Sequence, residues 1–253
     1  TVTINQDSAQ ADPTGTSPIN FAVVFNKPVN SATFTAADVV LGGTAGATTV
    51  VVTGSGTTYN VAVSGMTLSG TVIATIPAGG IQDPAGNGNT ASTSVDNTVT
   101  YDITLPTVTV NQAVGQADPT NGSPINFTVV FSEPMTGFTN TDVLLTGTAV
   151  PTTAVVTGGG TTYNVAVSGM SGSGTVIVSV PAGGATDVSG NLNAASTSTD
   201  DTVTFDVTRP TVTINQDGAQ ADPTGTSPIN FAVVFSEPVS GFTNADVILS
   251  GTA

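Results

Sequence analysis

The chain has no cysteine, no histidine and no tryptophan, and only 8% of its residues are charged. Without thiol or imidazole groups it has no disulfides, none of the commonest catalytic bases, and none of the usual zinc or copper ligands. Two basic residues, Lys27 and Arg209, stand against 17 acidic ones, which gives a net charge of -15. Because such a chain has no basic surface to neutralise phosphates, we exclude nucleic acid as a partner.

Long apolar runs are also missing. Valine, alanine and isoleucine are interleaved with threonine, serine and glycine, and no stretch approaches the roughly 18 apolar residues of a membrane-spanning helix. We therefore expect no insertion into a membrane. The chain begins at Thr1 without a signal-peptide pattern, and we interpret it as mature or internal sequence.

The sequence repeats itself. The hexapeptide TVTINQ at residue 1 returns as TVTVNQ at residue 107 and as TVTINQ at residue 211, so the period is 106 and then 104 residues. A period of this length fits independent domains rather than the short rungs of a solenoid. We predict three units arranged as beads on a string: residues 1–106, residues 107–210 and an incomplete unit at 211–253, named repeat 1, repeat 2 and repeat 3.

Within each repeat the hydrophobic pattern has a period of two. In repeat 1, Ile19, Phe21, Val23 and Phe25 alternate with more polar or smaller residues, as expected for a half-buried strand. Glycine- and proline-rich turns separate further short runs of this kind, giving about seven strands per repeat, the number found in immunoglobulin-like sandwiches. The predicted fold is all-β, with tandem immunoglobulin-like β-sandwiches of antiparallel strands.

Several motifs then match a known family. The segment FSEPMTGFTNTDV at 131–143 recurs at 235–247 as FSEPVSGFTNADV, the loop 187–191 reads DVSGN, and the linkers 102–106 and 206–210 read DITLP and DVTRP. These motifs resemble the bacterial Ig-like (Big) repeats of large surface or secreted proteins. The resemblance implies a non-catalytic stalk repeat of adhesin type, located outside the cell or on its surface. Repeat 1 departs from the motif, because Lys27 stands where repeat 2 has Glu133.

The acidic residues raise the question of cation binding. Fifteen of the 17 are aspartate, a short carboxylate typical of turns and of cation shells. In an immunoglobulin-like sandwich the last strand leaves toward the next domain, so Asp102 should face Glu133 and the loop from Asp187 to Asn191. Ca²⁺ takes six to eight oxygen ligands with tolerant geometry. We therefore expect calcium as the cofactor at the junctions, with these candidate ligands: Asp102, Asp12, Glu133, Asp187, Asn191, Asp206, Asp118 and Glu237.

A simpler interpretation of the same residues remains open. In this interpretation Asp12 and Asp118, which precede prolines, form Asx-turns. Asp83 and Asp187 begin glycine-containing loops and bind no cation. Catalysis by paired carboxylates needs two acids in one cleft, whereas these acids recur once per repeat near loop tips. We therefore predict that the chain is not an enzyme.

Two functions remain open. In the first, the repeats are an extended spacer whose contacts are with neighbouring repeats, while other domains bind cell-surface receptors. In the second, they are subunits of an extracellular filament or sheath whose chains join by edge-strand pairing or strand exchange.

Repeat 3 carries a separate expectation. It contains only the first strands of the repeat, so its apolar face should be open to water. We expect either a continuation of the array or a neighbouring chain to supply the missing strands over Val212, Ile214, Ile229, Phe231, Val233 and Phe235.

Overall fold

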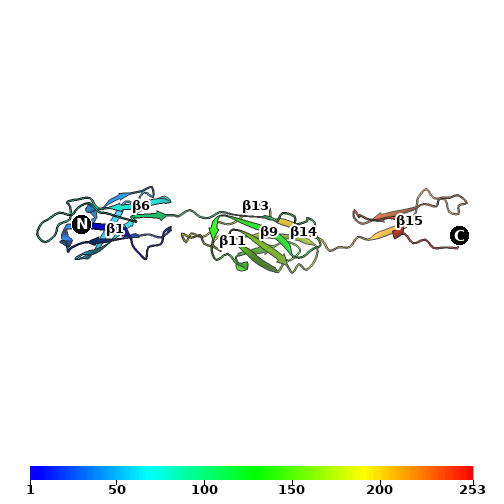
Figure 1. Ribbon diagram of the computed structural model, residues 1–253. Helices are drawn as coiled ribbons and strands as arrows, with labels where there is room; N and C mark the ends of the chain where they lie inside the picture. Colours follow the sequence, from blue (N-terminus) through cyan, green and yellow to red (C-terminus); the bar gives the residue numbers. More distant parts are fainter. Residues whose placement is uncertain (253) are drawn as a thin grey trace. The chain divides into compact units, whose positions relative to one another are not determined.

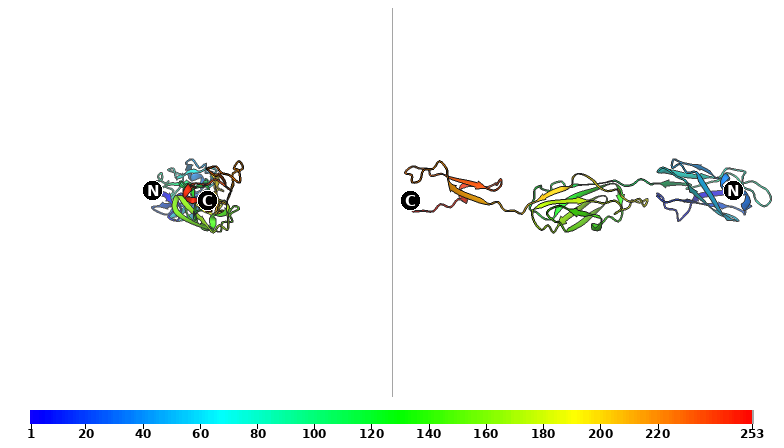
Figure 2. Two further views of the ribbon diagram at one scale, coloured as in Figure 1. Left: turned by 90° about the vertical axis from the view of Figure 1, so that its right-hand side faces the viewer. Right: turned by 180° about the vertical axis from the view of Figure 1, so that it is seen from behind.

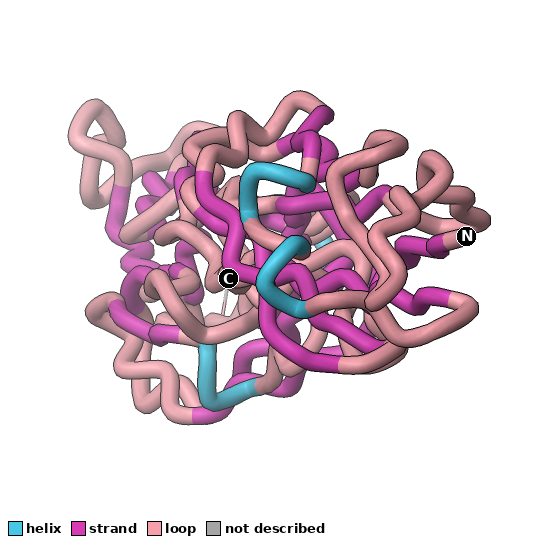
Figure 3. The backbone as a smooth tube through the Cα atoms, turned by 90° about the vertical axis from the view of Figure 1, so that its left-hand side faces the viewer, coloured by secondary structure: helices cyan, strands magenta, loops and turns pink. Residues whose placement is uncertain are grey.

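A computed structural model describes residues 1–252 and consists of β-strands, loops and short 3-10 turns (Figures 1 and 3). The prediction of an all-β fold is confirmed. None of the helices in the described part of the chain has the length and apolar character needed to cross a membrane. The 3-10 turns are η1 (Ser31–Thr33), η2 (Ala36–Asp38), η3 (Asn140–Asp142) and η4 (Asn244–Asp246).

Repeat 1 has the seven strands that its alternating pattern predicts. They form a four-stranded sheet in the order β1-β2-β5-β4 and a three-stranded sheet in the order β3-β6-β7. Both sheets are antiparallel. The strands are β1 (Val2–Gln6), β2 (Ile19–Phe25), β3 (Val40–Gly42), β4 (Thr49–Ser55), β5 (Thr58–Ser64), β6 (Gly70–Thr75) and β7 (Thr98–Tyr101).

Repeat 2 has the same two-layer arrangement, with sheets in the orders β11-β9-β8-β13 and β10-β12-β14. One pairing differs from the predicted antiparallel pattern, because β13 runs parallel to β8. The side chain of Asn111 holds this edge, since its Oδ1 accepts hydrogen bonds from the backbone N–H groups of Thr199 and Asp200. The strands are β8 (Val108–Gln112), β9 (Ile125–Met135), β10 (Leu144–Thr146), β11 (Thr153–Ser168), β12 (Gly174–Ser179), β13 (Thr197–Asp200) and β14 (Thr202–Phe205).

Each of these two repeats has its own hydrophobic core. Alternate residues of the strands point inward, and Phe21 and Phe127, at equivalent positions of β2 and β9, are fully buried. A trio of aromatic rings in edge-to-face contact closes one end of each core, with centroids 5.0–5.8 Å apart. Such contacts add about 0.5–1.5 kcal/mol per pair beyond the burial of apolar area. The trios are Phe25, Phe34 and Tyr59 in repeat 1, and Phe131, Phe138 and Tyr163 in repeat 2.

The chain divides into two compact units, Thr1–Phe205 and Asp206–Ala253. The first unit contains both cores, which lie on either side of the boundary predicted between residues 106 and 107. The division into three domains, at 1–106, 107–210 and 211–253, stays a prediction. The second unit has one antiparallel ladder, in which β15 (Val212–Gln216) pairs with β16 (Phe231–Phe235) and a long loop joins the two strands (Figure 2).

The apolar face of this second unit is largely exposed. Val212 is 55% exposed, whereas Val108 at the equivalent position of repeat 2 is 1% exposed, and Phe231 is 55% exposed against 0% for Phe127. Among the other four predicted residues, Ile214 and Ile229 are exposed, while Val233 and Phe235 are partly buried. What would cover this face stays a prediction.

Candidate functional site

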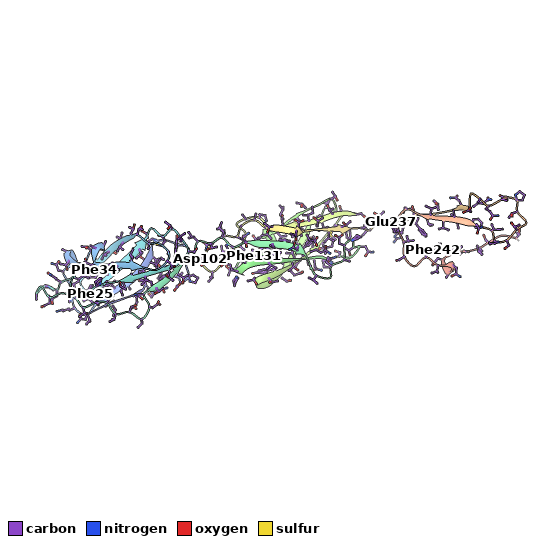
Figure 4. The ribbon with its side chains drawn as sticks, turned by 90° about the horizontal axis from the view of Figure 1, so that it is seen from above. Phe25, Phe34, Asp102, Phe131, Glu237 and Phe242 are labelled. Carbon is purple, nitrogen blue, oxygen red and sulfur yellow. The ribbon has the colours of Figure 1, made fainter. Side chains whose placement is uncertain are left out.

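Three carboxylates from two repeats meet at the end of repeat 1. One oxygen each from Asp102, Glu133 and Asp187 lies within 4.8 Å of the other two, and no other group of this kind occurs among residues 1–252. Asp102 follows the last strand of repeat 1 (Figure 4), while the other two belong to repeat 2. The structure therefore brings together three of the eight predicted ligands.

Asp102 is held by hydrogen bonds on both carboxylate oxygens. Oδ1 accepts from the hydroxyl of Ser69 at 3.0 Å and from the backbone N–H of Thr104 at 2.9 Å. Oδ2 accepts from the hydroxyl of Ser189, in repeat 2, at 3.3 Å. Burial raises the pKa of the Asp102 carboxyl, but the donors from Thr104, Ser69 and Ser189 outweigh it, so the pKa lies below its ordinary value. This carboxylate is thus kept ionised and fixed in position.

Asp187 organises the loop that faces Asp102. It is 3% exposed, and its Oδ1 accepts the backbone N–H of Asn191 at 2.8 Å, while Oδ2 accepts the Asn191 side-chain amide at 3.0 Å. The same amide donates to the backbone carbonyl of Asp102 at 2.9 Å. Asn191 therefore belongs to the site, but its amide nitrogen serves as a donor that joins the two repeats.

Glu133 lies near the end of β9, in the alternating set that includes the buried Phe131 and Met135. This places its carboxylate at the rim of the sandwich, partly buried. Burial raises the pKa of Glu133, and the negative charges of Asp187 and Asp102 raise it further. At such separations each like-charge pair repels by about 1 kcal/mol in water and by about 4 kcal/mol near a protein surface. A positive charge at this point would remove that repulsion.

The two repeats also touch through backbone groups at this junction. The N–H of Gly15 in the loop between β1 and β2 donates to the carbonyl of Ser189 at 2.8 Å. A Cβ atom at Gly15 would lie 2.9 Å from the Asp102 carbonyl oxygen and 2.9 Å from Asn191 Oδ1. This close approach requires glycine. Sequence reasoning missed Gly15 and Ser69, because neither has a charge or lies in one of the family motifs. Ser189 lies within the DVSGN motif at 187–191, but its hydroxyl was not expected to contact Asp102.

The remaining predicted ligands lie outside the cluster. Asp12 is exposed, and its Oδ1 accepts the backbone N–H of Thr100 at 2.9 Å, so it attaches the loop after β1 to the last strand of its own repeat. Asp118 does the same with Thr204 in repeat 2, at 2.9 Å. Both positions therefore have a structural role within one repeat, through a contact with the last strand.

Asp206 and Glu237 are the counterparts of Asp102 and Glu133 in the second unit. Asp206 Oδ1 accepts the backbone N–H of Thr208 at 2.9 Å, as Asp102 does with Thr104. Glu237, labelled in Figure 4, is partly buried by its accessible surface. The sequence to residue 253 has no counterpart of Asp187 in this repeat. Whether these two residues bind a cation stays a prediction.

Two packed sheets of about seven strands with aliphatic and aromatic cores define an immunoglobulin-like β-sandwich. Residues 102–204 match the family model described as the bacterial Ig-like domain, and this segment of the chain is a member of that family. A search of curated proteins finds none that matches the chain. Domains of this family are structural repeats of bacterial surface proteins and are generally non-catalytic.

Proposed function

We propose that the repeats form a non-catalytic stalk or spacer of a bacterial cell-surface or secreted protein, with calcium bound at the junction of repeats 1 and 2. The observation that carries the calcium part is the meeting of three carboxylates from two repeats within 4.8 Å. The spacer part is supported by the family of residues 102–204 and by the direct hydrogen bonds of Gly15 and Asn191 across the junction. A spacer needs joints that resist bending, and these contacts supply one.

The donor set fits calcium. Asp102, Glu133 and Asp187 would hold the ion, and carboxylate oxygens are the hard ligands that Ca²⁺ prefers. Three acids would more than balance its charge, and waters could complete six to eight ligands. Mg²⁺ demands a smaller, nearly ideal octahedron, whereas these side chains come from two repeats and are fixed by their own hydrogen bonds. When bound, the ion supplies positive charge that joins the repeats, and it takes part in no reaction.

Calcium binding can be measured by isothermal titration of the whole chain after treatment with a chelator. We expect one site that Glu133→Gln weakens at least tenfold, because a neutral amide replaces one of three charged ligands. Glu237→Gln is the matched control, since Glu237 has the same motif but lies outside the carboxylate cluster of the described residues. An absence of binding at millimolar calcium, or an equal loss in both variants, would contradict the proposal.

The filament alternative rests on the edges of the sheets. The chain has a single lysine, Lys27, so its edge strands carry little of the positive charge that usually prevents pairing with another chain. Electron microscopy of purified protein separates the two functions. A spacer predicts isolated particles, whereas regular filaments that grow with protein concentration would favour the alternative.

A further inference from the structure

Repeat 1 carries a lysine where the other repeats carry a glutamate. Lys27 is the equivalent of Glu133 and Glu237, and it is the only lysine of the chain. Its Nζ donates to Asp83 Oδ2, and the two form an ion pair at the pole of repeat 1, the end that carries the loop from Asp83 to Asn87. Asp83 is itself the equivalent of Asp187, so a positive side chain faces the same aspartate that Glu133 faces in repeat 2.

The loop around this aspartate is otherwise built in the same way in both repeats. Asp83 Oδ1 accepts the backbone N–H of Asn87 at 2.9 Å, and Oδ2 accepts the Asn87 side-chain amide at 3.0 Å. Asp187 and Asn191 make the equivalent bonds at 2.8 and 3.0 Å. The loops are therefore matched, and what differs between them is the charge placed against the aspartate.

A second position changes together with the lysine. Ser189, whose hydroxyl donates to Asp102 Oδ2, is replaced in repeat 1 by Ala85. The pole of repeat 1 thus lacks both the glutamate and the hydroxyl that face Asp102 in repeat 2. It also has a fixed counter-ion, because the Lys27 ammonium group pairs with Asp83. The Asp83 side chain is 6% exposed, and the Lys27 side chain is 55% exposed.

We propose that Lys27 takes the place of the divalent cation at the pole of repeat 1, so that the residue at positions 27 and 133 decides whether a pole binds calcium. The inference rests on the proposed function at the junction of repeats 1 and 2. An ammonium group beside Asp83 neutralises the carboxylate from within the chain and repels a second cation. More than half of the Lys27 side chain is exposed, so it can also meet a carboxylate of another domain directly, without a metal.

The test transfers the lysine to the junction. Because the chain has no cysteine, Thr53→Cys and Thr157→Cys allow one spin label on an exposed position of each complete repeat. Pulsed electron–electron resonance then gives the distance distribution between the labels, and its width reports the freedom of the junction. We expect wild type to be narrow with calcium and broad with chelator, Glu133→Lys to be narrow in both, and Glu133→Gln to be broad in both.

The outcomes separate this inference from the proposed function. If wild type does not respond to calcium, the proposal that calcium binds at the junction is wrong. A distance distribution for Glu133→Lys that is narrower than that for Glu133→Gln would still support the inference that a lysine can take the place of the cation. If Glu133→Lys is as broad as Glu133→Gln in chelator, the inference is overturned, even where wild type responds to calcium.

A reciprocal variant covers the case in which Glu133→Lys does not fold. Lys27→Glu places two carboxylates at the pole of repeat 1, and calcium should then increase the hydrogen-exchange protection of residues 83–89. The same residues of wild type should not respond. Protection in Lys27→Glu that is independent of calcium would overturn the inference.

Discussion

Two tyrosines at equivalent positions, Tyr59 and Tyr163, are both buried, but their hydroxyl groups have different surroundings. The Tyr163 hydroxyl donates to the backbone carbonyl of Met135 at 3.1 Å. The Tyr59 hydroxyl is buried with no hydrogen-bond partner among the described residues. In repeat 2, strand β9 continues to Met135, whereas β2 ends at Phe25 and a longer loop follows, so the equivalent carbonyl is not presented to Tyr59.

Substitution of each tyrosine by phenylalanine should therefore have opposite effects. Tyr163→Phe removes a buried hydrogen bond, whose net contribution is about 0.5–1.5 kcal/mol, and leaves the ring contacts intact. Tyr59→Phe removes a buried hydroxyl that has no hydrogen-bond partner among the described residues. The free energy of unfolding of repeat 1 should therefore be unchanged or higher by up to about 1 kcal/mol. For domains of this size 1 kcal/mol corresponds to a shift of about 4–8 °C in Tm.

Hydrogen exchange of the whole chain in increasing urea gives the free energy of unfolding of each repeat from its own peptides. We expect Tyr163→Phe to lower that free energy in repeat 2 alone, and Tyr59→Phe not to lower it in repeat 1. Each repeat serves as the internal control for the variant in the other. Equal destabilisation by both substitutions would refute the reasoning, because it would show that the Tyr59 hydroxyl is satisfied in solution.

Three further predictions follow from the contacts described above. Lys27 holds the pKa of the Asp83 carboxyl below its ordinary range, so Lys27→Gln should lower the free energy of unfolding of repeat 1 at pH 7. The difference in the free energy of unfolding between Lys27→Gln and wild type, measured by urea denaturation, should be smaller at pH 3, because Asp83 of the unfolded chain takes up a proton below about pH 4. A difference that is constant with pH would contradict the ion pair. Gly15→Ala should broaden the distance distribution between the spin labels at positions 53 and 157. Gly225→Ala is the control and should not broaden it, because nothing lies within 4 Å of the added Cβ atom. Distributions of equal width in the two variants would show that the close approach of Gly15 is unimportant. Deletion of residues 206–253 removes the exposed apolar face and should lower the fluorescence of a hydrophobic dye, while an unchanged signal would show that this face is covered in solution.

Much of the candidate site could be predicted from sequence. Asp102, Glu133 and Asp187 were expected at one junction because the last strand of a sandwich points toward the next repeat, and the structure brings them together. Asp12 was expected at the same junction, and its equivalent Asp118 was a further candidate ligand between domains, but each accepts a backbone N–H from the last strand of its own repeat. Spacing along the chain could not separate these cases, because both kinds of aspartate recur once per repeat.

The sequence by itself determined the strands and their recurrence. Alternation of apolar and polar residues places inward side chains such as Phe21 and Phe127 because successive residues of a strand face opposite sides of the sheet. That rule is local, so it needs no knowledge of distant residues. The tertiary structure alone decided which groups meet across long separations, such as the Gly15 N–H with the carbonyl of Ser189, and the Tyr163 hydroxyl with Met135. Those contacts depend on loop length and on backbone direction, which residue type does not encode.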